Sequence, residues 1–181
     1  MTAEDSGTPA LFDPDAPGEQ PVGALESLIS EIESEISELQ FPRFSKDDAL
    51  NLGLLLVELG KDGHLPIAID ISKGEHVLFH VALDGVTPDN GHWVKAKRRT
   101  AARYEEPSLL VGLRGRLGGG RIEDNAWFDQ TTYAAHGGSF PVYVQGAGAV
   151  ATVTVSGLPQ KADHDLVVRA LREILASMRL G

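Results

Sequence analysis

An Asp-His pair follows the motif Ser-Gly-Leu-Pro-Gln near the carboxyl end of the chain. An imidazole in such a place can carry protons or bind a ligand. Asp163 and His164 lie in the first turn of the last expected helix, where a carboxylate stabilises the free N–H groups by about 0.3–1 kcal/mol. Adjacent helical residues point roughly 100° apart, so the two side chains do not easily share one small ligand. We therefore predict that Asp163 caps the helix, and we retain His164 as a candidate ligand-binding residue.

A second candidate site surrounds two consecutive glycines before the apolar run SFPVYV. Gly137 and Gly138 either let a ligand approach the backbone closely or form a tight turn with a positive φ. His136 precedes them; it either lines the mouth of a pocket between sheet and helix or is an exposed loop histidine. Ser156 ends a later expected strand, where its hydroxyl can contact a ligand. We keep all four residues as ligand-binding candidates.

A third candidate is the helix that carries the basic cluster of the chain, Lys95, Lys97, Arg98, Arg99 and Arg103. Trp93 and Lys97 are four residues apart, so both lie on one helix face. A flat indole beside an ammonium group suits a small anionic ligand such as a carboxylate or a phosphate. Two alternatives stay open. Trp93 is a core residue and the cations face water, or the cluster pairs with the acidic helix of a neighbouring subunit.

The sequence assigns no catalytic residue and no metal site. It has no cysteine, which removes thiolate ligands and cysteine nucleophiles. It also lacks a Gly-x-Ser-x-Gly elbow, a Walker loop and a dinucleotide fingerprint. His76 and His80 are expected on one face of a strand with Cα atoms about 13 Å apart, too far for one ion. We therefore favour binding over catalysis.

The negative charge is concentrated at the amino terminus. The net charge is −10, and the first 40 residues hold ten of the 26 acids before the first base, Arg43. The other 16 acids are balanced by the 16 bases, so general nucleic-acid binding is disfavoured. No apolar run approaches 18 residues and the start lacks a basic n-region. We expect a cytoplasmic protein that does not cross a membrane.

Helices and β-hairpins must position the candidate residues. Residues 1–22 hold four prolines and scattered acids, so we predict a disordered acidic tail followed by one domain over 23–181. Apolar spacing predicts an acidic amphipathic helix over 24–40, a helix that begins at Ser45 and is buried on more than one side, and a final helix through 178. Between them we expect hairpins over 67–83 and 139–156, helices over 92–104 and near 107–114, and a strand within 121–133.

Several motifs in this order resemble the haem-degrading-domain family. They are DDALNLGLLL, LPIAIDIS, DNGHWVKAKRRTAARY, YAAHGGSFPVYV and VATVTVSGLPQKADHDLVV, within residues 40–178. The sequence is most similar to the uncharacterised cytoplasmic branch of this family, which also includes a haem-binding secreted protein and a glycolate-operon accessory protein. The resemblance implies an α+β fold, a profilin-like three-layer α/β/α sandwich with about five mostly antiparallel strands. It also implies a homo-oligomer and makes haem a candidate cofactor.

Three functions remain open from the sequence. The first is an oligomeric module that binds a small molecule or a partner without catalysis. The second is a haem-binding or haem-degrading protein, in which iron would need a histidine or hydroxyl ligand and His136 is the residue to test. The third is an adaptor whose acidic N-terminus binds a basic partner. A Soret shift on adding haem, lost in His136→Ala, would select the second function and assign its ligand.

Overall fold

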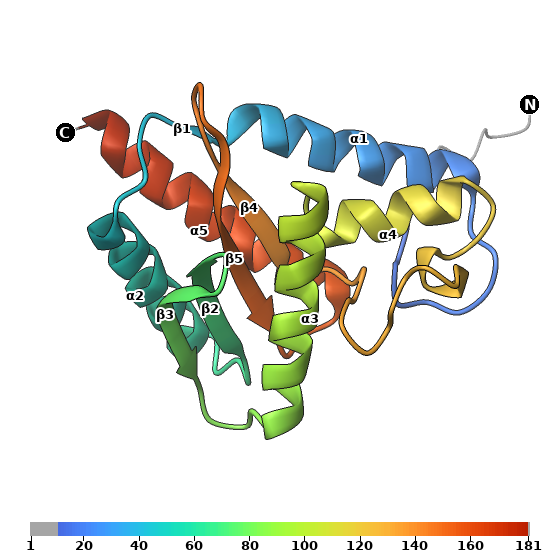
Figure 1. The fold of residues 1–181 in the computed structure, drawn as a ribbon, viewed down its shortest axis with the longest axis horizontal. Coiled ribbons are helices and arrows are strands. Elements are labelled where there is room, and N and C mark those ends of the chain that lie inside the picture. The colour runs from blue at the N-terminus through green and yellow to red at the C-terminus, as the bar shows by residue number, and fades with distance from the viewer. Residues whose placement is uncertain (1–10, 181) are drawn as a thin grey trace, which may run out of the picture.

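One five-stranded sheet lies between two helical layers in the computed structural model, which describes residues 11–180 (Figure 1). The strand order is β1-β4-β5-β2-β3, and only β1 and β4 run parallel. The strands are β1 (Gln40–Phe41), β2 (Ala68–Lys73), β3 (His76–Ala82), β4 (Ser139–Val144) and β5 (Gly148–Ser156). The predicted α+β class, with a profilin-like sandwich and a mostly antiparallel sheet, is confirmed.

Five α-helices cover the sheet. They are α1 (Val22–Glu38), α2 (Lys46–Asp62), α3 (Pro88–Tyr104), α4 (Ser108–Leu117) and α5 (Gln160–Leu180). Helices α2 and α5 pack on one face of the sheet, α3 and α4 contact the other, and α1 packs on α4. Ser45 begins α2 through a capping box with Asp48, as the sequence predicts, which contributes about 1 kcal/mol. Within the described residues, no helix is long and apolar enough to span a membrane.

The sheet has one apolar and one polar face, because side chains alternate along each strand. Toward α2 and α5 lie the buried apolar residues Ile69, Ile71, Phe140, Val153 and Val155. Toward α3 lie the buried polar residues Asp70, Ser72, Ser139, Thr152 and Thr154. Buried polar groups need hydrogen-bond partners, so the layer beneath α3 is where specific polar chemistry is concentrated.

A β-bulge changes the side-chain alternation of β3. Ile71 is opposite Phe79, whereas Ser72 is opposite Val77, so β3 contains one extra residue at this point. His80 consequently faces Asp70 on the α3 side. His76 lines a hollow next to the start of α2 on the other side. The expectation that these two histidines share a face is therefore wrong.

Two further expectations differ from the structure. The segment 121–133 has no strand; it contains the 3-10 helix η1 (Ile122–Asp124) and turns in which side chains such as Asp129 accept local backbone N–H groups. Local hydrogen bonds of this kind compete with strand pairing. Helix α2, whose apolar residues run nearly all round, buries only one side and leaves Leu50 and Leu54 exposed.

The amino-terminal segment and α1 rest on the body of the same chain. The prediction of disorder for residues 1–10 lies outside the described residues. Residues 11–21 form an irregular strap with several polar contacts: the Pro14 carbonyl oxygen accepts from Arg116, and Asp15 accepts the N–H of Gln160. The acidic helix α1 lies within salt-bridge distance of basic residues in α4 and α5 through Glu31, Glu33, Glu35 and Glu38.

Candidate functional site

Lys97 and Asp163 form a buried ion pair between α3 and the start of α5. Lys97 Nζ donates to Asp163 Oδ2 at 2.8 Å and to the Val155 carbonyl oxygen at 3.4 Å. The two side chains are 6% and 0% exposed. Lys97 is therefore neither a solvated surface cation nor free to bind an anion in this structure.

Asp163 lies in the first turn of α5, as the sequence predicts. Its carboxylate accepts backbone N–H groups from the loop before α5, those of Gly157 and Leu158 at 3.4 and 3.0 Å. Burial raises the pKa of this carboxyl group, against the lowering effect of Lys97 and of these N–H groups. The pair and the two N–H groups together fix the end of β5 against the start of α5.

The two glycines and Ser156 lie around this ion pair. Gly138 has φ +124°, and a side chain there would clash with the Val155 carbonyl oxygen and crowd Asp163 and Lys97. A Cβ at Gly137 would clash with the Gln160 carbonyl oxygen, so both glycines permit close packing of backbone against backbone. Ser156 is buried at the end of β5. What these two glycines allow to approach closely is other backbone of the same chain, at Val155 and Gln160.

His164 lies away from this group, against helix α1. Its Nε2 is 2.8 Å from Glu35 Oε2, and both side chains are almost fully buried. Within the described residues its Nδ1 is buried without a hydrogen-bond partner. A buried charged or polar pair of this kind fixes how two elements dock, and here it joins α5 to α1.

Trp93 and His136, which belong to separate candidate sites in the sequence, come together in the structure. Their ring centroids are 5.2 Å apart, and the indole N–H of Trp93 donates to Asp89. Burial lowers the pKa of His136, partly offset by Glu123, whose Oε1 lies 3.8 Å from His136 Nε2. The hollow beside His136 measures only about 10 Å³. No ligand of haem size fits there while the strap is in place.

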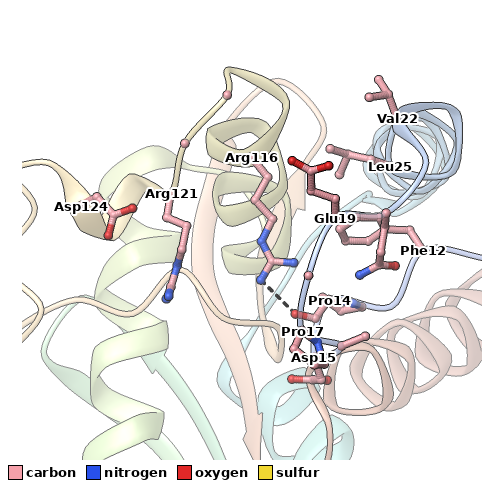
Figure 2. Close-up of a pocket in the computed structure, with 15 residues that line it drawn as sticks. Phe12, Pro14, Asp15, Pro17, Glu19, Val22, Leu25, Arg116, Arg121 and Asp124 are labelled. Carbon is pink, nitrogen blue, oxygen red and sulfur yellow. Dashed lines mark hydrogen bonds between the residues drawn. The ribbon is translucent and has the colours of Figure 1, made fainter.

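A larger hollow of about 800 Å³ lies between the strap, the start of α1 and the turn after α4 (Figure 2). Arg116 donates to the Pro14 carbonyl oxygen at 2.9 Å and stacks on Phe12. The acids Asp15, Glu19 and Asp124 also line this hollow, opposite Arg116 and Arg121. It contains no histidine, and its mixed charges do not favour a dianionic ligand.

A third hollow combines residue types that hold haem in other proteins. It measures about 400 Å³, within the roughly 300–1,000 Å³ typical of ligand sites. Its lining combines an imidazole, two ammonium groups and an apolar wall: His76, Lys46, Lys73, Phe44, Leu78, Val150 and Ala151. Histidine is an axial ligand of haem iron, and lysine pairs with carboxylates. These residues fit the group.

The remaining histidines fit haem less well. His64 lines a hollow of about 460 Å³ that offers one cation, Lys61, and an opposing acid, Asp84. His80 is bound through Nδ1 to Asp70, and His164 is buried against Glu35. Sequence reasoning missed the His76 hollow, because the bulge that turns His76 toward α2 has no signal in the residue pattern.

The architecture defines a three-layer α+β sandwich domain with hollows at its helix–sheet junctions. A family profile described as “Haem degrading protein HbpS-like” matches residues 44–172, and the chain belongs to this family. A UPF0303 protein of Streptomyces coelicolor is 50% identical over 147 residues, 81% of this chain and 93% of that protein. A UPF0303 protein of Rhizobium etli is 45% identical over 152 residues, 84% of this chain and 92% of that protein.

Solved structures agree with this assignment. The crystal structure of the Ybr137w protein has a TM-score of 0.76 and 28% identity, and the match covers 87% of this chain and 96% of that one. HbpS has a TM-score of 0.58 and 20% identity, with 75% and 92% covered. A PduOC–haem complex has a TM-score of 0.61 and 15% identity, with 71% and 93% covered. The last two share the fold, and the predicted family is confirmed.

Proposed function

We propose that this chain is a non-catalytic binding protein for an anionic, partly apolar small molecule, and that haem is the ligand to test first. The observation that carries the proposal is the hollow between β3, β5 and the start of α2. It joins an imidazole, two cations and an apolar wall, and no acid lines it. The family description and the haem complex of a distant structural neighbour support the choice of haem.

Each group in the hollow has a defined role in this proposal. His76 would hold the iron, and Lys46 and Lys73 would pair with the carboxylates of the ligand. Phe44, Leu78 and Val150 would cover the apolar part of the ligand and exclude water from it. A bound haem would supply redox-active iron whose properties the axial ligand and the surroundings set.

A haem titration followed by visible absorption tests the proposal. We expect a saturable Soret shift in the wild type that His76→Ala removes. His92→Ala is the matched control, because His92 is an exposed histidine outside the hollow and its loss should leave the shift unchanged. Lys46→Ala and Lys73→Ala should each weaken binding about two- to fivefold, as exposed ion pairs do. No saturable shift in the wild type would refute haem binding, and loss in His136→Ala alone would relocate the site.

The predicted homo-oligomer is also part of the proposal. Strand β3 is an open edge of the sheet, with Val77 exposed on it, and Leu50 and Leu54 are exposed on α2, the helix that packs against β3. Open edges and exposed apolar side chains are typical of surfaces that associate. Size-exclusion chromatography coupled to light scattering measures the molar mass directly, and a monomer at all concentrations would contradict the predicted homo-oligomer.

The third hypothesis, an adaptor whose acidic N-terminus binds a basic partner, stays a prediction.

A further inference from the structure

The hollow that His64 lines lies where the carboxyl-terminal end of α2 meets the end of the edge strand β3. One wall continues a single face of α2, because its residues recur at helical spacing: Val57, Gly60, Lys61 and His64. The other wall is the end of β3 and the turn after it: Ala82, Leu83 and Asp84. Its volume of about 460 Å³ is within the range of roughly 300–1,000 Å³ that small-molecule sites occupy.

The apolar part of this hollow depends on Gly60. A Cβ at Gly60 would lie 2.6 Å from Leu83 Cδ1 and 3.0 Å from Ile67 Cδ1. The missing side chain therefore lets Leu83 pack directly against α2. Val57 and Leu65 extend the apolar lining, which suits an aliphatic group.

Charges of both signs line the same hollow. Lys61 contributes an ammonium group from α2, and Asp84 contributes a carboxylate from the turn after β3. Among residues 11–180 neither side chain takes part in a salt bridge, whereas Lys161 reaches both Glu31 and Asp165. Two opposite charges that line one hollow without contacting each other can each take a charge-assisted hydrogen bond from a ligand between them.

His64 has a backbone conformation that glycine adopts more easily. Its φ is +51°, just past the end of α2, where a left-handed residue that ends a helix is usually glycine. The Leu65 N–H donates to the Gly60 carbonyl oxygen at 2.8 Å across this turn. Strained residues of this kind are concentrated at functional sites, and here the strained residue places an imidazole in the lining of the hollow.

We propose that this hollow binds a small apolar zwitterion, a molecule with an ammonium group and a carboxylate group on an aliphatic body, such as a short apolar peptide. Asp84 accepts from the ammonium group, Lys61 donates to the carboxylate, and His64 adds a hydrogen-bonding ring on the side of Lys61. The His76 hollow has no acid in its lining, so the two hollows select different ligands. The zwitterion site does not depend on haem binding.

Titration of the full chain with the dipeptide Leu-Leu, followed by backbone amide NMR signals, tests this site. We expect saturable shifts at Lys61, His64 and Asp84. N-acetyl-Leu-Leu lacks the ammonium group and Leu-Leu amide lacks the carboxylate. Each should bind up to about fivefold more weakly than Leu-Leu, the factor that corresponds to an exposed ion pair of ~1 kcal/mol. Free leucine, titrated in parallel, distinguishes a single amino acid from a peptide as the better ligand.

Each charge of the hollow has a variant and a matched control. Asp84→Asn should remove the preference for Leu-Leu over its acetylated form, and Lys61→Met should remove the preference over the amide. Asp62→Asn and Lys95→Met remove the same charges from exposed positions outside the lining, so both preferences should remain in these controls.

His64→Gly separates binding from folding. Because glycine adopts a positive φ without strain, this variant should melt no lower than the wild type and yet bind Leu-Leu more weakly. The proposal is overturned if Leu-Leu causes no saturable shift, or if both blocked peptides bind as tightly as Leu-Leu. It is also overturned if His64→Gly melts at a lower temperature with unchanged binding, because the histidine would then serve the fold alone.

Discussion

Neutralising one member of the Lys97–Asp163 pair should destabilise the fold far more than neutralising both. Asp163→Asn keeps the side-chain shape but leaves the Lys97 ammonium group buried without a counter-charge. Lys97→Met leaves a buried carboxylate with two backbone N–H donors. The double variant contains neither charge, so the desolvation cost of both ions disappears.

The magnitude follows from the burial of both groups. Leaving one buried charge without its partner costs about 3–5 kcal/mol. For a chain of this size each kcal/mol lowers Tm by about 2–4 °C, so each single variant should melt about 6–20 °C below the wild type. Groups in direct contact show coupling energies of about 0.5–3 kcal/mol, and we expect the upper part of that range here.

Urea unfolding of the wild type, both single variants and the double variant measures the coupling. The pH adds a second readout for Lys97→Met. Burial raises the pKa of Asp163, so the folded state takes up this proton at higher pH than the unfolded chain. The decrease in the free energy of unfolding that Lys97→Met causes should therefore become smaller as the pH falls toward the raised pKa of Asp163. Additive single effects, or a loss below about 1 kcal/mol in Asp163→Asn, would refute the reasoning.

Three further predictions concern other buried positions. Because burial lowers the pKa of His136, the unfolded chain binds this proton more tightly, and the free energy of unfolding should fall as the pH drops below about 6.5. Urea melts at neutral and mildly acidic pH should show a smaller fall in His136→Gln, and an equal fall would contradict the assignment. His164→Ala leaves the buried Glu35 carboxylate with the more distant Arg172 Nη2, 3.8 Å from its Oε1, and should cost about 3 kcal/mol, measured by thermal melting; a loss under about 1 kcal/mol would argue against a tight pair. Gly138→Ala should cost more than Gly146→Ala, because both have positive φ but only Gly138 faces a β5 carbonyl oxygen; equal melting temperatures would count against the close contact.

Residue periodicity was sufficient to predict the main elements. Alternating Ile67, Ile69 and Ile71 indicate a strand, and Ser45 with Asp48 marks a helix start; the structure has strand β2 from Ala68 to Lys73, buried on both faces, and the predicted cap at Ser45. These are local signals, since a strand face or a helix cap depends on neighbouring residues. The order of the motifs then indicated the family, which fixed the layer arrangement that periodicity alone leaves open.

Contacts between distant residues could not be predicted in the same way. Lys97 and Asp163 are 66 positions apart, and nothing in either local sequence shows that they pair. The bulge opposite Ile71 and Ser72 separates His76 from His80, although strict alternation would have kept them together. Of the predicted site residues, Trp93 contacts His136, and Gly138 adjoins Lys97, whereas His164 belongs to a different contact with α1.

Helix α1 shares a small apolar cluster with α4, made of Leu25, Leu28, Ile29, Ile32, Leu109, Leu110 and Leu113, separate from the main core. It reaches α5 through charged groups, among them Glu35 and Glu38. A helix attached in this way can detach or unfold locally while the sheet stays folded. The backbone amides of α1 should therefore exchange with deuterium sooner than those of β5, because α1 opens locally while the sheet stays folded.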